Sequence, residues 1–594
     1  MRLFGGAQVE NLMARLNIDE SLPIENNLVA KLVEQSQARV EGNNFDIRKH
    51  LLEYDDVLNM QRKRIYEQRD RVFTKQDLSE DVREMLQNEL KSRVETALED
   101  EEGPWKLLAY LEDVQPPITF EGVAYPSFTM RLMMDEVAEE LGDEPISAEQ
   151  LRRTLLDLAR RALQAESNHL LRSIEVLLER SEEAIQQQLT ERLETVETFF
   201  EGLPDRLEEA GGSLRPQELV EELSGLVRVP LRLNTEEMRA LAQGGDHLVE
   251  RVKEQVESAL MNITLNRVIG AIQRRIEELE ARPMQYQGRD WDEAARLLYG
   301  EVERLLNERV ERLSSPDGPI ARDLDAALER VGDGKIVLAQ NQAALLGLLG
   351  IMTQGTRLTF DRRTHRRGRQ QVVRMTYIFY AATLLEGRTA EDLSEEILEH
   401  LEGARLALQR VWGNYELRRL IQTETPLSRL NQSLQERLRA VLGNERFEEI
   451  AESNLKDLPA EDLLEISRTL GERLQNEIYR EILLGVISQL WVDYLTRVDA
   501  LRVSIGLEAY AQRDPLVQYK SKATELFSQL LKDIRAGVVA RMFTFQPSRG
   551  ATVQVERDRS SSETPAKTEG VPAAAVEAGN EASRSARKKK RRRH

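Results

Sequence analysis

Two stretches near the carboxyl end of the chain repeat apolar residues at steps of three and four, which places them on one face of an α-helix. The first set is Ile482, Val486, Leu490, Tyr494, Val498 and Leu501, and the second is Tyr519, Ala523, Leu526, Leu530, Ile534 and Val538. Between them, Asp514 is suited to cap the second helix, and Pro515 suits its first position, where no N–H is needed. The pattern predicts a helical hairpin with Tyr510 at its tip.

A second run of helical sequence lies near the amino end. Residues 24–74 contain no proline, and apolar residues recur along them with Gly42 as the single glycine. We predict one long helix over this range, or two helices that meet at Gly42. The apolar seam of such a helix needs partners along its length. Residues 1–22 are predicted to form a short helical lead-in.

The middle of the chain changes character twice. Residues 104–130 hold prolines and a glycine and are predicted as loop or short strand, whereas residues 145–315 return to charged, helical sequence. Residues 357–360 and 371–380 then have β-rich composition and flank a basic turn at residues 362–369, which indicates a β-hairpin.

Helical sequence resumes over residues 390–543, and the residues after 545 lack periodicity, which is typical of a disordered tail. The fold class predicted from the whole pattern is mainly α, with one small β-hairpin region.

The composition agrees with long amphipathic helices, since 41% of the residues are hydrophobic, 31% are charged and only 5% are aromatic. A net charge of −20 should repel nucleic acid and anionic lipid except where positive charge is concentrated locally. The chain has no cysteine, which excludes disulfides, a thiol nucleophile and thiolate-bound zinc. The most apolar run, residues 336–352, is shorter than the ~20 residues that a membrane span requires, and no signal peptide is visible. We therefore expect a soluble, cytoplasmic protein whose membrane contact is peripheral.

No catalytic arrangement stands out in the sequence. The single Gly-Lys pair, Gly334-Lys335, is followed by Ile336 and lacks the glycine spacing of a phosphate-binding loop. Paired carboxylates are frequent, but at this charge density they are typical of solvated helix faces. We expect no catalytic, cofactor-binding or metal-binding residues in this chain, so its sequence leaves open whether it belongs to an enzyme.

Two blocks of sequence match a known family. Residues 40–57 and their continuation to Arg69 resemble the start of the helical scaffold domain of SecA, the bacterial preprotein translocase motor. A second set of residues is similar to the family's two-helix finger: Leu490, Trp491, Leu501, Arg502, Tyr510, Gln512, Asp514, Pro515 and Tyr519.

The resemblance implies a division of the chain into five parts. They are a remnant of the second nucleotide-binding domain (1–22), the long scaffold helix (23–75), the helical wing domain (76–470), the two-helix finger with the end of the scaffold (471–545), and a disordered tail with a basic end (546–594). About residues 145–440 would be a large helical insertion, on whose role the resemblance is silent. The family's nucleotide-binding domains would precede Met1, as expected of a truncated or split gene product.

The sequence also departs from the family pattern. Ser488 and Tyr494 stand where the family usually has Asp and His, and Glu508 replaces a usual Arg near the tip. A basic end without cysteine replaces the family's zinc-binding tail, so no metal site is carried over.

The resemblance implies a scaffold and finger portion of an ATP-driven motor that pushes preproteins through the Sec channel. The residues expected to contact preprotein at the fingertip are Leu507, Tyr510 and Gln512. Those expected to build the finger are Trp491, Leu501, Arg502, Asp514, Pro515 and Tyr519. Those expected in scaffold or interdomain contacts are Phe45, Arg48, Tyr54, Asp55, Asp56 and Arg69, although charged residues of this kind also line ordinary solvated faces.

The partners implied by the resemblance are the Sec protein-conducting channel, preproteins and anionic phospholipid at the inner face of the cell membrane, with the ribosome and a second copy as further candidates. ATP and Mg²⁺ are expected only together with the family's nucleotide-binding domains.

Two basic clusters are candidate anion-binding sites. They are Arg362, Arg363, Arg366, Arg367 and Arg369 in the predicted hairpin, and Lys588, Lys589 and Lys590 in the tail. Arginines on a hairpin also serve as ordinary edge protection. Two alternative hypotheses for the function of the whole chain are a stand-alone helical adaptor and a nucleic-acid-binding helical protein without a specific DNA partner. The net charge of −20 makes the nucleic-acid-binding hypothesis the weaker of the two.

Overall fold

The structure is a computed structural model, and it describes residues 27–100, 102–142, 144–209, 215–329, 336–361, 366–505 and 514–545. In this part of the chain nearly every element is a helix, and the strands form two small antiparallel hairpins. The prediction of a mainly α fold is confirmed.

The longer α-helices are α2 (Asn27–Thr74), α3 (Ser79–Leu98), α4 (Gly103–Val114), α5 (Phe128–Leu141), α6 (Ala148–Glu201), α8 (Pro216–Val227), α10 (Val249–Gln273), α11 (Trp291–Ser314), α12 (Pro319–Leu328), α13 (Gln342–Thr353), α15 (Ala390–Gln422), α16 (Gln432–Leu442), α18 (Ala460–Ser504) and α19 (Pro515–Met542). The shorter α-helices are α7 (Leu203–Glu209), α9 (Thr235–Leu241), α14 (Ile378–Thr383) and α17 (Asn444–Ile450). The strands are β1 (Ile118–Phe120), β2 (Val123–Tyr125), β3 (Gln354–Asp361) and β4 (Arg366–Val373).

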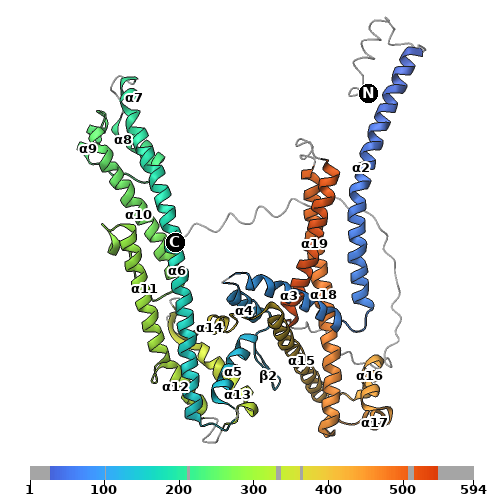
Figure 1. Cartoon of the computed structure of the whole chain (residues 1–594). Helices are drawn as coiled ribbons and strands as arrows, with labels where there is room; N and C mark the ends of the chain where they lie inside the picture. The colour runs from blue at the N-terminus through green and yellow to red at the C-terminus, as the bar shows by residue number, and fades with distance from the viewer. Residues whose placement is uncertain are drawn as a thin grey trace, which may run out of the picture.

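Two long arms rise from a common base (Figure 1). One, the hairpin arm, consists of α2, α18 and α19, which pack along one another. The other, the α6 arm, consists of α6 with α10 and α11 along its side and α7 to α9 at its far end. Helices α3, α4, α5 and α13 to α15 form the base that joins the arms.

The buried apolar residues follow this division. The largest cluster runs from the base into the hairpin arm, from Val57 on α2 to Met542 on α19. The α6 arm has two clusters of its own, one around Leu298 and Ile269 and one around Phe200 at its far end. The largest cluster also includes Leu151 to Leu163 on α6 and Val310 and Leu313 on α11, so the α6 arm has separate cores only beyond the base.

Helix α2 is one continuous helix through Gly42, so the single-helix form of the prediction is correct. At a rise of 1.5 Å per residue its 48 residues span about 72 Å. A glycine costs only about 1 kcal/mol in a helix interior, which is too little to break a long helix whose other residues favour the helical state.

The prediction of loop or strand over residues 104–130 is wrong for its first half. Residues Gly103–Val114 form α4, because Pro104 sits in the first turn, where proline is tolerated, and Leu107, Leu108 and Leu111 bury one face. The strand part of the prediction holds for β1 and β2, which pair around the turn at residues 121–122.

The second hairpin exists, but its second strand is shifted from the predicted range. Strand β4 ends at Val373, and Ile378–Thr383 is the helix α14 rather than strand. The β-rich composition of residues 377–380 reflects burial at a helix junction: Tyr377 is 2% exposed and its hydroxyl donates to the carbonyl of Leu349 at 3.0 Å. The predicted basic turn is correspondingly shorter, because Arg366, Arg367 and Arg369 belong to β4.

Candidate functional site

The hairpin of α18 and α19 has the predicted helical faces. The buried members of the two apolar sets are Ile482, Val486, Tyr494, Val498, Tyr519, Ala523, Leu530, Ile534 and Val538, and Leu490, Leu501 and Leu526 are partly buried against the same core. The cap is also confirmed, since Oδ1 of Asp514 accepts the backbone N–H of Leu516 at 2.8 Å and of Val517 at 3.4 Å, with Pro515 as the first helical residue. The sequence therefore predicted both helical faces and the start of the second helix correctly.

A buried polar contact joins the hairpin to α2. The hydroxyl of Tyr494 on α18 donates to Oε1 of Gln61 on α2 at 2.6 Å, and Nε2 of Gln61 donates to the carbonyl of Ala523 on α19 at 3.2 Å. Tyr494 is 3% exposed and Gln61 is 7% exposed. These three residues, the Gln61 node, connect all three helices of the arm through groups that are costly to leave unpaired in an apolar core.

Burial keeps the Gln61 node in one protonation state. Removal from water raises the pKa of the Tyr494 hydroxyl well above its ordinary value, and the nearby Tyr519 phenol adds to this effect. Tyr494 therefore remains a hydrogen-bond donor at neutral pH.

Aromatic rings pack around the Gln61 node. Tyr54 on α2 meets Tyr519 on α19 edge to face, with ring centroids 4.7 Å apart. Tyr494 stacks on Trp491 at 5.3 Å and meets the edge of Phe527 at 5.9 Å. Such pairs add about 0.5–1.5 kcal/mol each beyond the area they bury. Of these rings, Tyr54, Trp491 and Tyr519 were predicted site residues.

Nearer the tip, one ion pair bridges α2 and α18. Nη1 of Arg502 lies 3.2 Å from Oδ1 of Asp55, and the two side chains are 38% and 49% exposed. A pair as exposed as this contributes less than about 1 kcal/mol to stability. It adds a contact between α2 and α18 on the tip side of the Gln61 node.

At the other end, α18 holds the carboxyl terminus of α2. The guanidinium of Arg480 donates to the carbonyl of Val72 at 3.2 Å and to that of Lys75 at 2.9 Å. Oδ1 of Asn476 accepts the backbone N–H of Leu78 at 2.9 Å, and its amide nitrogen donates to the carbonyl of Gln76. These partners satisfy backbone groups that a helix end and its following turn leave open.

Sequence reasoning missed Gln61, Asn476 and Arg480. One signal for Gln61 was present, since it lies four residues after Val57 and four before Ile65, in the middle of the buried seam of α2. A lone amide in an apolar stripe indicates a specific buried partner. Arg480 and Asn476 carry no comparable local signal, because their partners lie about 400 residues away.

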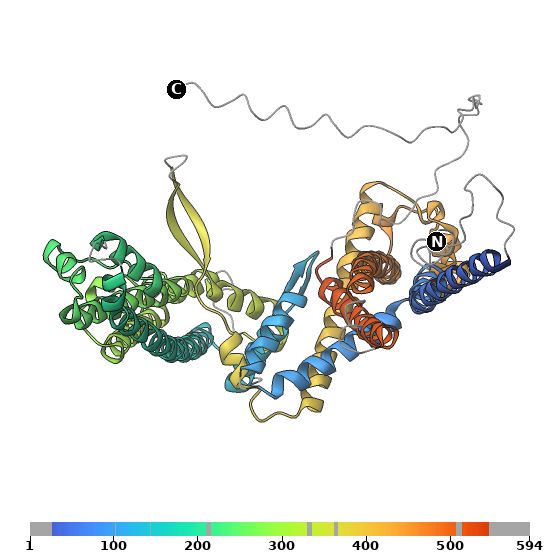
Figure 2. The ribbon, with the colours of Figure 1, turned by 90° about the horizontal axis from the view of Figure 1, so that it is seen from above.

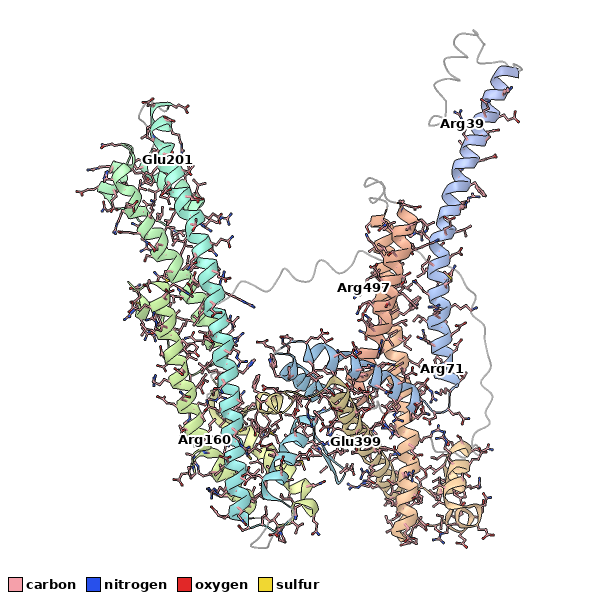
Figure 3. The ribbon with its side chains drawn as sticks, viewed as in Figure 1. Arg39, Arg71, Arg160, Glu201, Glu399 and Arg497 are labelled. Atoms are coloured by element: carbon pink, nitrogen blue, oxygen red, sulfur yellow. The ribbon has the colours of Figure 1, made fainter. Side chains whose placement is uncertain are left out.

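The other predicted scaffold residues do not join these contacts. Phe45 is 67% exposed and Arg48 is exposed, and both lie on the half of α2 that projects past the end of the hairpin. Figure 3 shows this projecting half at Arg39 and the held end of α2 at Arg71. Asp56 is exposed and Arg69 is partly exposed, as expected of a solvated helix face.

Several predicted residues lie outside the described residues. They are Leu507, Tyr510 and Gln512 at the expected tip, Arg362 and Arg363 between β3 and β4, and Lys588, Lys589 and Lys590 in the tail. Arg366, Arg367 and Arg369 lie on the described backbone of β4.

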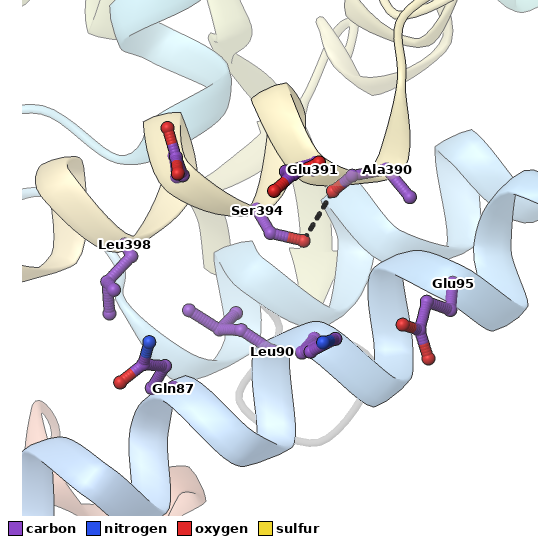
Figure 4. Close-up of a pocket in the computed structure, with 9 residues that line it drawn as sticks. Gln87, Leu90, Glu95, Ala390, Glu391, Ser394 and Leu398 are labelled. Atoms are coloured by element: carbon purple, nitrogen blue, oxygen red, sulfur yellow. Dashed lines mark hydrogen bonds between the residues drawn. The ribbon is translucent and has the colours of Figure 1, made fainter.

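A groove of about 360 Å³ lies between α3 and α15 (Figure 4). It is lined by Gln87, Leu90, Lys91, Glu95, Ala390, Glu391, Ser394, Glu395 and Leu398. Its one hydroxyl, Oγ of Ser394, donates to the carbonyl of Ala390 in its own helix at 2.6 Å, rather than to a general base. The lining therefore contains no arrangement for nucleophilic catalysis.

In the part of the chain that the structure describes, no group of three or more His, Asp or Glu residues is placed to hold a metal ion. Among the same residues, no helix has the length and apolar character needed to cross a membrane.

Comparison with known proteins points to one family. The family model described as SecA Wing and Scaffold domain matches residues 23–201 and 369–546, which leaves residues 202–368 unmatched, a narrower range than the predicted insertion. A protein translocase subunit SecA from Pelotomaculum thermopropionicum is 45% identical over 117 residues, which is 19% of this chain and 13% of that protein.

Further relatives match over similarly limited ranges. The protein translocase subunit SecA of Syntrophus aciditrophicus is 44% identical over 115 residues, 19% of this chain and 14% of that protein. That of Clostridium botulinum is 35% identical over 153 residues, 25% of this chain and 18% of that protein. The matched region thus spans less than a fifth of the length of these relatives, and no solved structure matches the chain.

Proposed function

Because the chain belongs to the SecA wing and scaffold family, we propose that it forms the scaffold, wing and two-helix finger of an ATP-driven motor that pushes preproteins through the Sec channel. In this proposal the hairpin of α18 and α19 is the finger, and α2 carries motion to it. ATP and Mg²⁺ would bind to the family's nucleotide-binding domains, and no residue of this chain is assigned to ATP hydrolysis.

The observation that supports the proposal is the attachment of α2 to the hairpin at three levels along the helix. They are the Asp55–Arg502 ion pair, the Gln61 node, and the hydrogen bonds from Arg480 to the carbonyls of Val72 and Lys75. The levels span residues 55–75, about 30 Å along α2. Because α2 is attached to the hairpin at several points along its length, the two cannot slide or rotate separately. A displacement of α2 therefore moves the hairpin with it.

The described part of the hairpin continues past its outermost contact with α2. From Arg502 to Ile505, three residues of helix and helix end carry the chain about 5 Å further toward the tip. We propose that Tyr510, with Leu507 and Gln512, contacts the preprotein beyond this point. A tyrosine suits varied substrates, because its ring makes nonspecific contacts while its hydroxyl stays hydrated.

The proposed partners follow from this role. They are the Sec protein-conducting channel, preproteins and the anionic phospholipid of the inner face of the cell membrane, where the protein would act from the cytoplasm.

Preprotein transport into inverted membrane vesicles tests the proposal. The assay supplies the nucleotide-binding domains of a SecA together with this chain and compares Tyr510→Ala with the unsubstituted chain. We expect lower transport with unchanged nucleotide binding. Tyr415→Ala is the matched control, since Tyr415 is a 40% exposed tyrosine on α15, remote from the hairpin tip in sequence. Equal transport by Tyr510→Ala and the control would contradict the finger assignment.

A further inference from the structure

The most isolated element of the structure is the ribbon formed by β3 and β4. All eight residues of β3 pair with the eight of β4, from Gln354 opposite Val373 to Asp361 opposite Arg366. At about 3.3 Å per residue the ribbon is about 26 Å long. It stands away from the helices (Figure 2).

Among the described residues, no third strand pairs with either edge of this ribbon. Val373, near the base of the ribbon, is 76% exposed. An isolated two-stranded ribbon is marginally stable by itself in water, so a ribbon of this length that stands away from the helices is suited to contact a partner.

The base of the ribbon is held firmly. Arg374, the residue after β4, forms an ion pair with Asp323 on α12, and Nη2 of Arg309 on α11 donates to the Arg374 carbonyl at 2.8 Å. Gly355 permits this arrangement, since a Cβ at that position would collide with the Arg374 side chain. A ribbon mounted in this way loses little conformational freedom when it binds a partner.

The strands concentrate positive charge in a chain with a net charge of −20. They contain four arginines and one aspartate. Paired residues of an antiparallel ribbon share a face, so the register puts Arg367 and Arg369 on one face and Arg357 and Arg366 on the other. Each face thus has two arginines.

We propose that the β3–β4 ribbon binds nucleic acid through its phosphate backbone. A flat anionic membrane would meet only one face or the tip of the ribbon, which leaves half of the arginines unused. A nucleic acid can contact both faces, since a duplex major groove admits a two-stranded ribbon and a single strand can wrap around one. Arginine also matches phosphate oxygens with a forked pair of N–H donors.

This site is separate from the proposed motor role. Residues 354–368 of the ribbon fall in the segment that the family model does not match. The ribbon would thus supply a contact outside most of the region that the family model matches, and its test is independent of the test of the finger.

The test measures binding of the full chain to labelled polyuridylate of about 20 nucleotides, and to duplex DNA of the same length, over a range of salt. The ribbon variant combines Arg366→Gln, Arg367→Gln and Arg369→Gln. We expect at least a tenfold weaker affinity and a shallower dependence on salt, lower by about 2 in the log–log slope for a single strand. The triple Arg→Lys variant at the same positions should bind more tightly than the Gln variant, because it retains the charge, and less tightly than the unsubstituted chain, because it loses the forked donors.

Two controls separate the ribbon from the rest of the chain. Arg160→Gln, Arg215→Gln and Arg304→Gln remove the same charge from exposed sites on the α6 arm and should leave binding unchanged. Lys588→Gln, Lys589→Gln and Lys590→Gln test the basic tail. Circular dichroism should show an unchanged helical fold for each variant, since none of the substituted residues of the ribbon or the tail lies in a described helix.

The outcomes are distinct. Weakened binding in the ribbon variant alone supports the proposal, and the RNA and DNA arms identify which polymer is bound. Unchanged nucleic-acid affinity in the ribbon variant, or a loss of affinity in the tail variant alone, would overturn the proposal. Binding to phosphatidylserine vesicles that depends on the ribbon, without binding to either nucleic acid, would overturn it in favour of a membrane contact.

Discussion

The hydroxyl of Tyr494 donates a 2.6 Å hydrogen bond to Oε1 of Gln61, a residue 433 positions away in the sequence. The same amide donates to the Ala523 carbonyl at 3.2 Å, so one side chain of α2 contacts both helices of the hairpin. Gln61 and Tyr494 are almost fully buried, and apolar and aromatic side chains surround them. The pairing therefore selects one register of α2 against the hairpin, because any slide would leave these groups unpaired in the core.

The first prediction concerns this node. Gln61→Ala should lower the free energy of unfolding of the hairpin arm by about 1–3 kcal/mol, since it leaves the buried Tyr494 hydroxyl without its partner. Hydrogen exchange measured over α2, α18 and α19 would detect the loss locally. Gln68→Ala, at an exposed glutamine of the same helix, is the control and should have little effect. If the two variants show the same hydrogen-exchange rates over α2, α18 and α19, the Gln61 node does not stabilise the hairpin arm.

The second prediction ranks two arginines of α18. Arg480→Ala should destabilise the junction of α2 and α3 by about 1–3 kcal/mol, because carbonyls at the end of α2 lose charged donors. Arg502→Ala should cost less than about 1 kcal/mol, because its pair with Asp55 is partly exposed. Urea unfolding of the two variants, with exchange at residues 72–78 as the local readout, checks the order. A larger loss of unfolding free energy in Arg502→Ala than in Arg480→Ala would contradict this prediction.

The third prediction concerns pH. Burial lowers the pKa of His400 to about 3, and the nearby Arg131 guanidinium adds to this shift. In the unfolded chain a histidine has a pKa near 6.5, so between about pH 6.5 and 3 the unfolded state binds a proton that the folded state does not. Above about pH 6.5 His400 is neutral in both states and does not reduce stability. As the pH drops from 6.5 toward 3, protonation of the unfolded state progressively lowers the free energy of unfolding.

Thermal unfolding at pH 7 and pH 5 measures this effect. His400→Gln should reduce the loss of Tm between the two pH values, whereas His247→Gln, at an exposed histidine, should not. A residual slope is expected in His400→Gln, because burial also lowers the pKa of His169. An unaltered pH dependence in His400→Gln would show that this histidine does not control it.

The fourth prediction tests whether the arms are independent. Leu298 on α11 is fully buried in the core of the α6 arm, and its neighbour Leu297 is 44% exposed. Leu298→Ala should cost about 2–5 kcal/mol and raise hydrogen exchange in α6, α10 and α11, without changing exchange in α2, α18 or α19. Leu297→Ala is the matched control and should have a small effect. Increased exchange in the hairpin arm as well would mean that the two cores unfold together.

Parts of the candidate site were predictable because their signals are local. The two apolar sets of the hairpin repeat at helical spacing, and the Asp514 cap with Pro515 behind it marks the start of α19. Tyr54, Asp55, Trp491, Arg502 and Tyr519 were all predicted as site residues, and the structure brings them together at the contact of α2 with the hairpin. The predicted Phe45 and Arg48 lie in the first half of α2, which extends past the described ends of α18 and α19 (Figure 1).

The sequence by itself determined the helical class, the single long helix near the amino end and the capped hairpin near the carboxyl end, because periodicity and capping act within a few residues. Only the tertiary structure decided that residues 378–383 are helix rather than strand, since burial of Tyr377 and packing against α4 and α6 outweigh β-rich composition. It also decided which polar groups pair inside the hairpin arm. Gln61, Asn476 and Arg480 find partners some 400 residues away, and such pairs depend on which surfaces are buried together, which no local pattern encodes.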